Sequence, residues 1–213
     1  MKTQSKDVVM SNKYSLIVSF LIVLFSFACT RKSDEKKIIK DNSYFPLAVG
    51  NYWKYREYPG YGKFGYDISE TRVTDTIRVK DTLFYKIIYP YTREKLEWYL
   101  YKDPEDNIWA KDSLSGPLTL YQKKLTRKLD YIDLLEGKDS VKMNFISEDT
   151  IEVPAGTFEC LKFKLTFLCD TATPSYMWYS KGVGLVKTWF EIEDNREGGD
   201  ILIEARVNGV KYP

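Results

Sequence analysis

The sequence predicts an all-β domain, mostly antiparallel, with at most one or two short helices. Short segments of alternating apolar and polar residues recur along the chain, and turn-forming Gly, Pro, Asp and Asn separate them. Apolar residues at helical spacing occur in one stretch only, residues 124–135. Aromatic residues make up 15% of the chain and fall on both faces of several segments. We therefore expect a curved meander sheet, either a half-barrel or a two-layer sandwich.

The clearest strands lie in the middle of the chain. Pro154 and Gly156 occupy the second and fourth positions of a turn, and a long strand follows. One face of that strand is apolar and consists of Leu161, Phe163, Leu165 and Phe167, while Lys162, Lys164 and Thr166 form the other face. Strands over 176–179 and 185–190 follow, joined by a glycine-containing turn. This pattern is typical of an antiparallel meander with one apolar face.

The remaining elements are weaker but of the same kind. Residues 103–107 (DPEDN) predict a tight turn, since they lack the ligand spacing and distal acid of a calcium loop. Leu125, Leu129 and Ile132 fall at helical spacing and predict one short helix over 124–135. Further strands are expected at 66–79, 83–91, 96–101, 108–111, 118–122, 141–153 and 201–207, after a first strand that carries Trp53 and Tyr55 on one face.

The N-terminus has the pattern of a signal peptide. Lysines precede an apolar run from Tyr14 to Ala28, which is shorter than the about 20 residues that span a bilayer. Small residues, Ser26 and Ala28, lead into Cys29. Here the chain resembles a bacterial lipoprotein precursor, in which the cysteine is acylated and becomes the first residue.

Two interpretations of this cleavage region remain. The usual lipoprotein box has Leu three residues before the cysteine, where this chain has Ser26. Ser26 and Ala28 also fit ordinary signal cleavage, which would give a soluble secreted protein. The charged stretch behind Cys29 favours lipidation, because it would serve as a tether. The predicted organisation is a signal peptide over 1–28, a lipidated Cys29 and tether over 29–43, and an antiparallel β domain over 44–213.

Charge and composition exclude several functions. The formal charge is +2, and residues 1–28 account for it with Lys2, Lys6 and Lys13 against Asp7. The rest of the chain is neutral, so we expect no nucleic-acid partner. The chain has no histidine, which removes Ser-His-Asp and Cys-His catalysis and the commonest zinc ligand. We expect no metal and no cofactor.

The two remaining cysteines are expected to be unpaired. Cys160 and Cys169 would lie about 30 Å apart on one continuous strand, because each strand residue advances the chain by about 3.3 Å. Their positions also differ in parity, so their side chains would point to opposite faces. We expect Cys169 to pack on the apolar face.

Three stretches together carry a family resemblance: YFPLAVGNYWKY, VPAGTFECLKFK and WYSKGVGLVK. This layout resembles a group of uncharacterised envelope lipoproteins of Gram-negative bacteria. The resemblance covers most of residues 44–190 and implies a β-rich domain on a lipid anchor at the outer membrane, facing the periplasm or the cell surface. It supplies no catalytic residues. On architecture alone, the chain is also similar to Lol-type half-barrel lipoprotein carriers.

Our main functional hypothesis is a non-enzymatic lipoprotein that binds a lipid or other apolar small molecule in the concave face of the sheet. Trp98, Phe163 and Trp178 are the candidate lining residues. This hypothesis requires a cavity of about 300 Å³ or more in that face.

Two alternatives come from other classes. A structural or glycan- or protein-contact lipoprotein would present a coplanar, solvent-facing Trp/Tyr pair, and a buried tryptophan array would contradict it. A carboxylate hydrolase would need two acids about 5–10 Å apart in a cleft. Glu191, Glu193 and Asp194 are available for it, but acids in such a turn are usually solvated, so we predict no enzyme.

Overall fold

The computed structural model describes residues 41–58, 68–91, 94–134, 140–167, 175–192 and 196–213. All secondary-structure elements in these ranges are β-strands, which confirms the predicted all-β class. No helix in these ranges has the length and apolar character needed to cross a membrane. The strands are β1 (Tyr52–Tyr58), β2 (Ile68–Val79), β3 (Thr82–Tyr91), β4 (Glu94–Lys102), β5 (Ile108–Lys111), β6 (Thr119–Gln122), β7 (Asp130–Leu134), β8 (Ser140–Val153), β9 (Gly156–Phe167), β10 (Ser175–Ser180), β11 (Gly184–Ile192), β12 (Arg196–Val207) and β13 (Val210–Tyr212).

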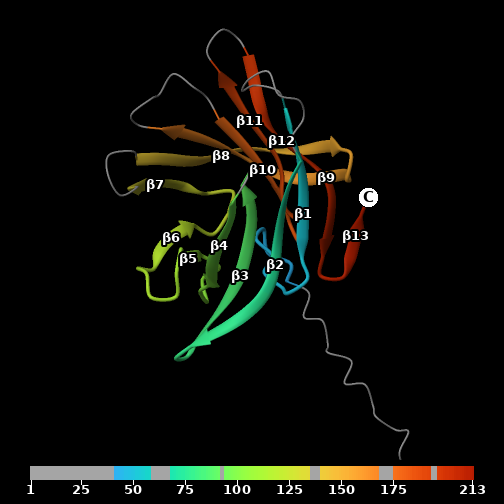
Figure 1. The fold of residues 1–213 in the computed structure, drawn as a ribbon. Helices are drawn as coiled ribbons and strands as arrows, with labels where there is room; N and C mark the ends of the chain where they lie inside the picture. Colours follow the sequence, from blue (N-terminus) through green and yellow to red (C-terminus); the bar gives the residue numbers. More distant parts are fainter. Residues whose placement is uncertain (1–40, 59–67, 92–93, 135–139, 168–174, 193–195) are drawn as a thin grey trace, which may run out of the picture. The chain divides into compact units, whose positions relative to one another are not determined.

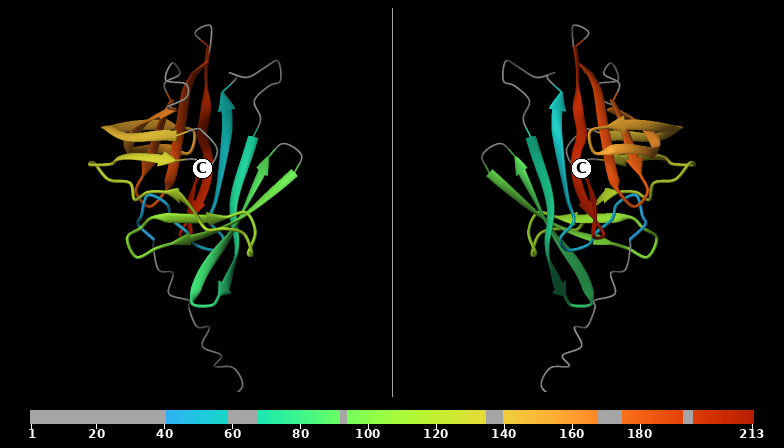
Figure 2. Two further views of the ribbon diagram at one scale, coloured as in Figure 1. Left: turned by 90° about the vertical axis from the view of Figure 1, so that its left-hand side faces the viewer. Right: turned by 90° about the vertical axis from the view of Figure 1, so that its right-hand side faces the viewer.

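All described strands belong to one antiparallel sheet that starts from a central pair, β1 and β12. From β1 the chain adds neighbours in order out to β6, and from β12 it adds neighbours in reverse order out to β7. Strand β13 pairs with β12 beside this path. Figure 2 shows the result: the β2–β6 side and the β7–β9 side face each other, with β1, β11 and β12 between them. The sheet is curved and open.

The two edges of the sheet come together without a backbone ladder between the described strands β6 and β7. These strands are consecutive in the chain but lie at opposite edges, so residues 123–129 connect the edges. Gln122 Nε2 donates to Met143 Sδ at 3.5 Å, and Phe145 N donates to Leu129 O at 2.9 Å. Residues at both ends of this connection therefore bond to β8, next to the edge strand β7.

Strand β9 has the faces that the sequence predicts, although their burial is uneven. Phe163 lies opposite Phe145 of β8 and Met177 of β10, and it has no exposed surface. Phe167 lies farther along the same face and is 36% exposed. The preceding turn forms as predicted, with Gly156 at φ 131°. The buried residues of the described ranges form two core clusters. The smaller cluster contains Leu161 and Phe163 of this face, together with Leu125, Met143 and Tyr179.

The predicted helix over 124–135 is wrong. A turn at 127–128 is followed by strand β7, which pairs with β8 along its whole length. Leu125 is buried and Leu129 packs against the same cluster, so their spacing reflects a shared core contact. Residues 130–134 satisfy their backbone N–H and C=O groups by pairing with β8, and this pairing is more favourable than the weak helix propensity of the stretch.

The residues before β1 fill one end of the curved sheet. We call residues 41–51 the lead-in segment. It crosses the lower end of the sheet in Figure 2 and buries Pro46 and Leu47. Asn51 is 2% exposed, and it donates to Pro46 O at 3.2 Å and accepts from Asn208 N at 2.9 Å. The segment is thus bonded to the turn between β12 and β13.

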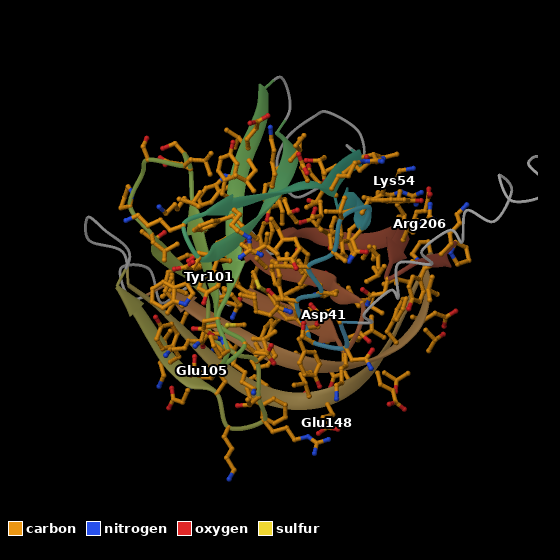
Figure 3. All side chains as sticks on the ribbon, turned by 90° about the horizontal axis from the view of Figure 1, so that it is seen from below. Asp41, Lys54, Tyr101, Glu105, Glu148 and Arg206 are labelled. Atoms are coloured by element: carbon orange, nitrogen blue, oxygen red, sulfur yellow. The ribbon has the colours of Figure 1, made fainter. Side chains whose placement is uncertain are left out.

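Asp41 ties the lead-in segment together. Its carboxylate accepts from Ser43 N and Leu47 N, both at 3.0 Å, and from Lys102 Nζ of β4 at 2.5 Å. Its carbonyl accepts from Asn208 Nδ2 at 2.9 Å. Figure 3 places Asp41 near the middle of this end of the sheet. These contacts involve residues upstream of Tyr44, where the sequence analysis starts the β domain.

The stretches that carry the family resemblance meet in the fold. Trp53 Nε1 donates to Val183 O at 2.6 Å, which joins the start of β1 to the turn before β11. Gly184 has φ 105°, and a Cβ on it would lie 3.4 Å from Trp53 Nε1 and 3.6 Å from Pro46 Cδ. Ala155 N donates to Leu202 O at 3.3 Å. Two of these stretches, YFPLAVGNYWKY and WYSKGVGLVK, are therefore in direct contact, and VPAGTFECLKFK pairs with WYSKGVGLVK through β9 and β10.

Replacing Asp41 should destabilise the protein in a pH-dependent way. Burial alone would raise the pKa of Asp41, but the hydrogen bonds from Lys102, Ser43 and Leu47 outweigh it and lower the pKa. The stabilisation is therefore present above the pKa of an unfolded aspartate and is lost as the pH falls through the folded value. At neutral pH, Asp41→Asn should lower the free energy of unfolding by about 1–3 kcal/mol, measured by urea denaturation.

The matched control is Asp106→Asn at the same end of the sheet. Its carboxylate is 44% exposed and 3.9 Å from Lys124, so the change should stay within about 0.5 kcal/mol. The deficit of Asp41→Asn should shrink in acid. Equal losses in the two variants, or a deficit that does not change with pH, would contradict this role of Asp41.

Candidate functional site

The main candidate site is an apolar cavity inside the curve of the sheet, with a volume of about 110 Å³. We call it the tyrosine cavity, because Tyr55 of β1, Tyr89 of β3, Tyr121 of β6 and Tyr179 of β10 line it. Strands β6 and β10 lie far apart in the sheet order, so only the curvature brings their side chains together. Phe45 and Pro46 of the lead-in segment also line the cavity.

Strand register explains why these tyrosines face inward. Tyr55 lies opposite Leu202, which is fully buried, and residues on opposed positions share a face. Tyr89 shares its face of β3 with Ile87, two residues earlier, which is 1% exposed and also lines the cavity. Tyr121 comes from the edge strand β6 and packs edge-on against Phe45, with ring centroids 6.0 Å apart. Phe45 of the lead-in segment therefore packs against Tyr121 at the solvent-facing side of the cavity.

The tyrosine hydroxyls are neutral and partly engaged. Burial raises the pKa of Tyr55, Tyr89 and Tyr179, and neighbouring tyrosines raise it further. Tyr55 donates to Leu185 O at 3.0 Å, and Tyr179 donates to Met177 Sδ at 3.4 Å. Tyr121, at 44% exposure, forms the rim. The cavity thus offers apolar walls and neutral phenol groups.

The cavity is smaller than the sequence analysis expects. Its volume of about 110 Å³ falls short of the roughly 300 Å³ that a lipid-sized ligand would need. An engineered apolar cavity of about 150 Å³ in another protein holds one benzene ring. The tyrosine cavity therefore suits one small ring or the end of one acyl chain, and a whole lipid does not fit inside it.

The structure does not bring the predicted lining residues together. Trp98 is half-buried and packs 6.2 Å from Tyr121, at the rim of the tyrosine cavity. Phe163 lies one layer behind the cavity wall, with its ring 6.2 Å from that of Tyr179. Trp178 lies on the opposite face of the sheet from Tyr179, its chain neighbour. Cys29 lies outside the described residues.

The tyrosines that line the cavity were missed as a group. The alternating pattern places Tyr55 on one face with Trp53, but nothing in the sequence predicts that Tyr55 lies near Tyr121 or Tyr179. The sequence does show tyrosines at alternating positions of several strands, and these positions share one face of the sheet. Only the strand order shows that the tyrosines of β6 and β10 meet across the sheet, and the sequence does not give that order.

Trp178 forms an aromatic cluster with Tyr176 and Trp189 and belongs to the larger of the two core clusters. Tyr176 lies between Trp178 and Trp189, with ring centroids 6.1 Å and 5.6 Å away, and Lys162 Nζ lies 4.9 Å from the Trp178 ring. Trp178 is 6% exposed, and its Nε1 donates to Asp149 Oδ2 at 2.9 Å. Tyr176 and Trp189 are inclined by 41° and half-buried. This cluster lacks the coplanar, exposed pair that the glycan-contact hypothesis requires.

Two of the three carboxylates that share one cavity in the described ranges are held by other side chains. A polar cavity of about 360 Å³ contains Glu148, Asp149 and Glu159, but Glu148 pairs with Arg127. The hydrogen bond from Trp178 lowers the pKa of Asp149, which is the wrong direction for a proton donor at neutral pH. No group of His, Cys, Asp or Glu in the described ranges could hold a metal ion.

Comparison with known proteins supports the fold. A DUF3108-like family model matches residues 138–194, which include β8–β11. No functionally curated protein matches the chain. A predicted lipoprotein from Parabacteroides distasonis ATCC 8503 has a similar structure, with TM-score 0.51 and 20% identity over 78% of this chain and 99% of that one.

A second similar structure is a predicted exported protein with a YmcC-like fold from Bacteroides fragilis NCTC 9343. It aligns with TM-score 0.51 and 16% identity, over 78% of this chain and 99% of that one. At such identities the likeness shows a shared fold. The architectural likeness to Lol-type carriers stays a prediction.

Cys160 should be unreactive in the folded protein. It is free, as the sequence analysis expects, and 3% exposed, while Cys169 lies outside the described residues. Burial, with a smaller effect of Asp149, raises the pKa of the Cys160 thiol to about 12. Iodoacetamide near pH 8 should therefore modify the Cys160 peptide only after unfolding, measured by peptide mass mapping. Equal labelling of native and unfolded protein would contradict this burial.

Proposed function

We propose that this protein is an exported, non-enzymatic lipoprotein, acylated at Cys29 and held at the outer membrane. The apolar run that ends at Cys29 supports export and acylation. The two similar structures belong to a predicted lipoprotein and a predicted exported protein. The family resemblance in the sequence supports the outer membrane as the site of anchoring.

We further propose that the β domain binds a small apolar group in the tyrosine cavity. The observation that carries this proposal is the cavity itself, where four tyrosines from four strands surround about 110 Å³ of space. An apolar group there would replace water on the tyrosine walls, and the phenol rings provide large contact area at low entropy cost. The cavity volume limits the part of the ligand that can be buried to one small ring or the end of one acyl chain.

The non-enzymatic assignment has its own support. The chain contains no histidine, and the carboxylate of Asp149 is held by Trp178 and Ser147. Asp200 has a raised pKa because it is buried, and its described hydrogen-bond partner is Thr188. Asp149 shares a cavity with Glu148 and Glu159, but its lowered pKa makes it a poor proton donor at neutral pH.

Removing the acylated cysteine should release the protein from membranes. Cys29→Ser abolishes the thioether that carries the lipid, so the variant should move from the membrane to the soluble fraction of the envelope. Intact-mass measurement of the wild-type protein should show the added acyl mass at the N-terminal peptide. An unmodified Cys29, or a variant that stays in the membrane fraction, would refute the anchor.

Filling the tyrosine cavity should abolish ligand binding. Thr71 of β2 lines the cavity, and Thr71→Phe would occupy its space. Native mass spectrometry of residues 30–213, purified without detergent, should show a co-purifying small mass in the wild type and none in this variant. Thr76→Phe makes the same change farther along β2, outside the cavity lining, and should keep the ligand. Equal occupancy in both variants would contradict the proposed site.

A further inference from the structure

A second cavity lies where the lead-in segment meets the end of the sheet. Its volume is about 360 Å³, which is within the usual size range of small-molecule sites. Residues 41–45 form one wall, the turn between β4 and β5 forms another, and residues 122–125 and Lys181 complete it. We call it the lead-in cavity.

The charged side chains of the lead-in cavity favour an anion. Lys123, Lys124 and Lys181 line it, together with two acids, Asp41 and Asp106. Asp41 is already paired with Lys102, and Asp106 lies 3.9 Å from Lys124 Nζ. Lys181 is exposed and has no ion pair among the described residues. Three lysines and two aspartates therefore line the cavity, and Lys102, from outside the lining, neutralises Asp41. Lys123 Nζ lies 5.4 Å from the centroid of the Tyr131 ring and has no ion pair among the described residues. Ammonium groups bind phosphate as point charges.

The length of the chain limits how far this cavity can lie from the proposed anchor. Asp41 lines the cavity, and the chain enters the described domain at that residue. From Cys29 to Asp41 the chain spans at most about 40 Å even when fully extended. This step rests on the proposed lipid anchor at Cys29. With that anchor in a membrane, the lead-in cavity lies within tether reach of the bilayer surface.

We propose that the lead-in cavity receives the phosphate of an anionic lipid headgroup and thereby orients the domain on the membrane. Lys123, Lys124 and Lys181 supply the positive charge. An anionic membrane provides this phosphate at high local density, and basic residues near such a surface contribute additively to binding. Free phosphate shares the chemistry but lacks the attraction of the surrounding surface charge.

The test measures binding without the anchor. Ile38–Pro213 form one compact unit with their own buried core, so residues 30–213 retain every contact described above. This form is sedimented with phosphatidylglycerol vesicles in about 0.1 M salt, where the Debye length is about 10 Å, with phosphatidylcholine vesicles in parallel. We expect binding to the anionic vesicles only. Lys124→Ala should weaken it about fivefold, and the triple change of Lys123, Lys124 and Lys181 to Ala about a hundredfold.

A second triple variant controls for net charge. Lys142, Lys164 and Lys211 lie outside the cavity lining, and changing them to Ala removes the same charge. This variant should lose less than about twofold, because salt screens distant charges. Far-UV circular dichroism and urea unfolding confirm that both triple variants fold.

Three results would overturn the proposal. They are equal binding to phosphatidylcholine, equal losses in the two triple variants, and release from the vesicles by inorganic phosphate at the same phosphate concentration. The last would assign the cavity to free phosphate. Failure of the anchor would be seen separately, in the fractionation of Cys29→Ser.

Discussion

The carboxylate of Asp41 holds the lead-in segment inside the open end of the sheet. An open, curved sheet leaves apolar side chains uncovered at its ends, and a connection of seven residues bridges its two edges. The lead-in segment covers this end with Pro46 and Leu47, and hydrogen bonds from Ser43, Leu47 and Lys102 converge on Asp41. Burying an acid is costly unless such donors surround it.

Both candidate sites depend on the same segment. Phe45 and Pro46 line the tyrosine cavity and limit its volume to about 110 Å³. Residues 41–45 form one wall of the lead-in cavity. The tether would therefore join the domain at a structural element that shapes two cavities.

Local patterns in the sequence predicted the strands well, because alternation and turn residues depend on neighbours in the chain. The face of Phe163, the turn before Gly156 and the glycine-containing turn before β11 are examples. The helix over 124–135 failed because Leu125 and Leu129 share a core cluster through an extended chain. The pairing of β1 with β12, and the cavity built across β6 and β10, follow from long-range order that periodicity does not encode.

The most direct test of the lead-in segment is native-state hydrogen exchange of individual amides. Leu47 N bonds to Asp41 Oδ2 and Gly182 N bonds to Ser43 O at 2.8 Å, so both amides report on this segment. If it belongs to the cooperative core, they should exchange only on global unfolding, as slowly as the interior amides of β9. Fast exchange of both, with β9 still protected, would contradict the account.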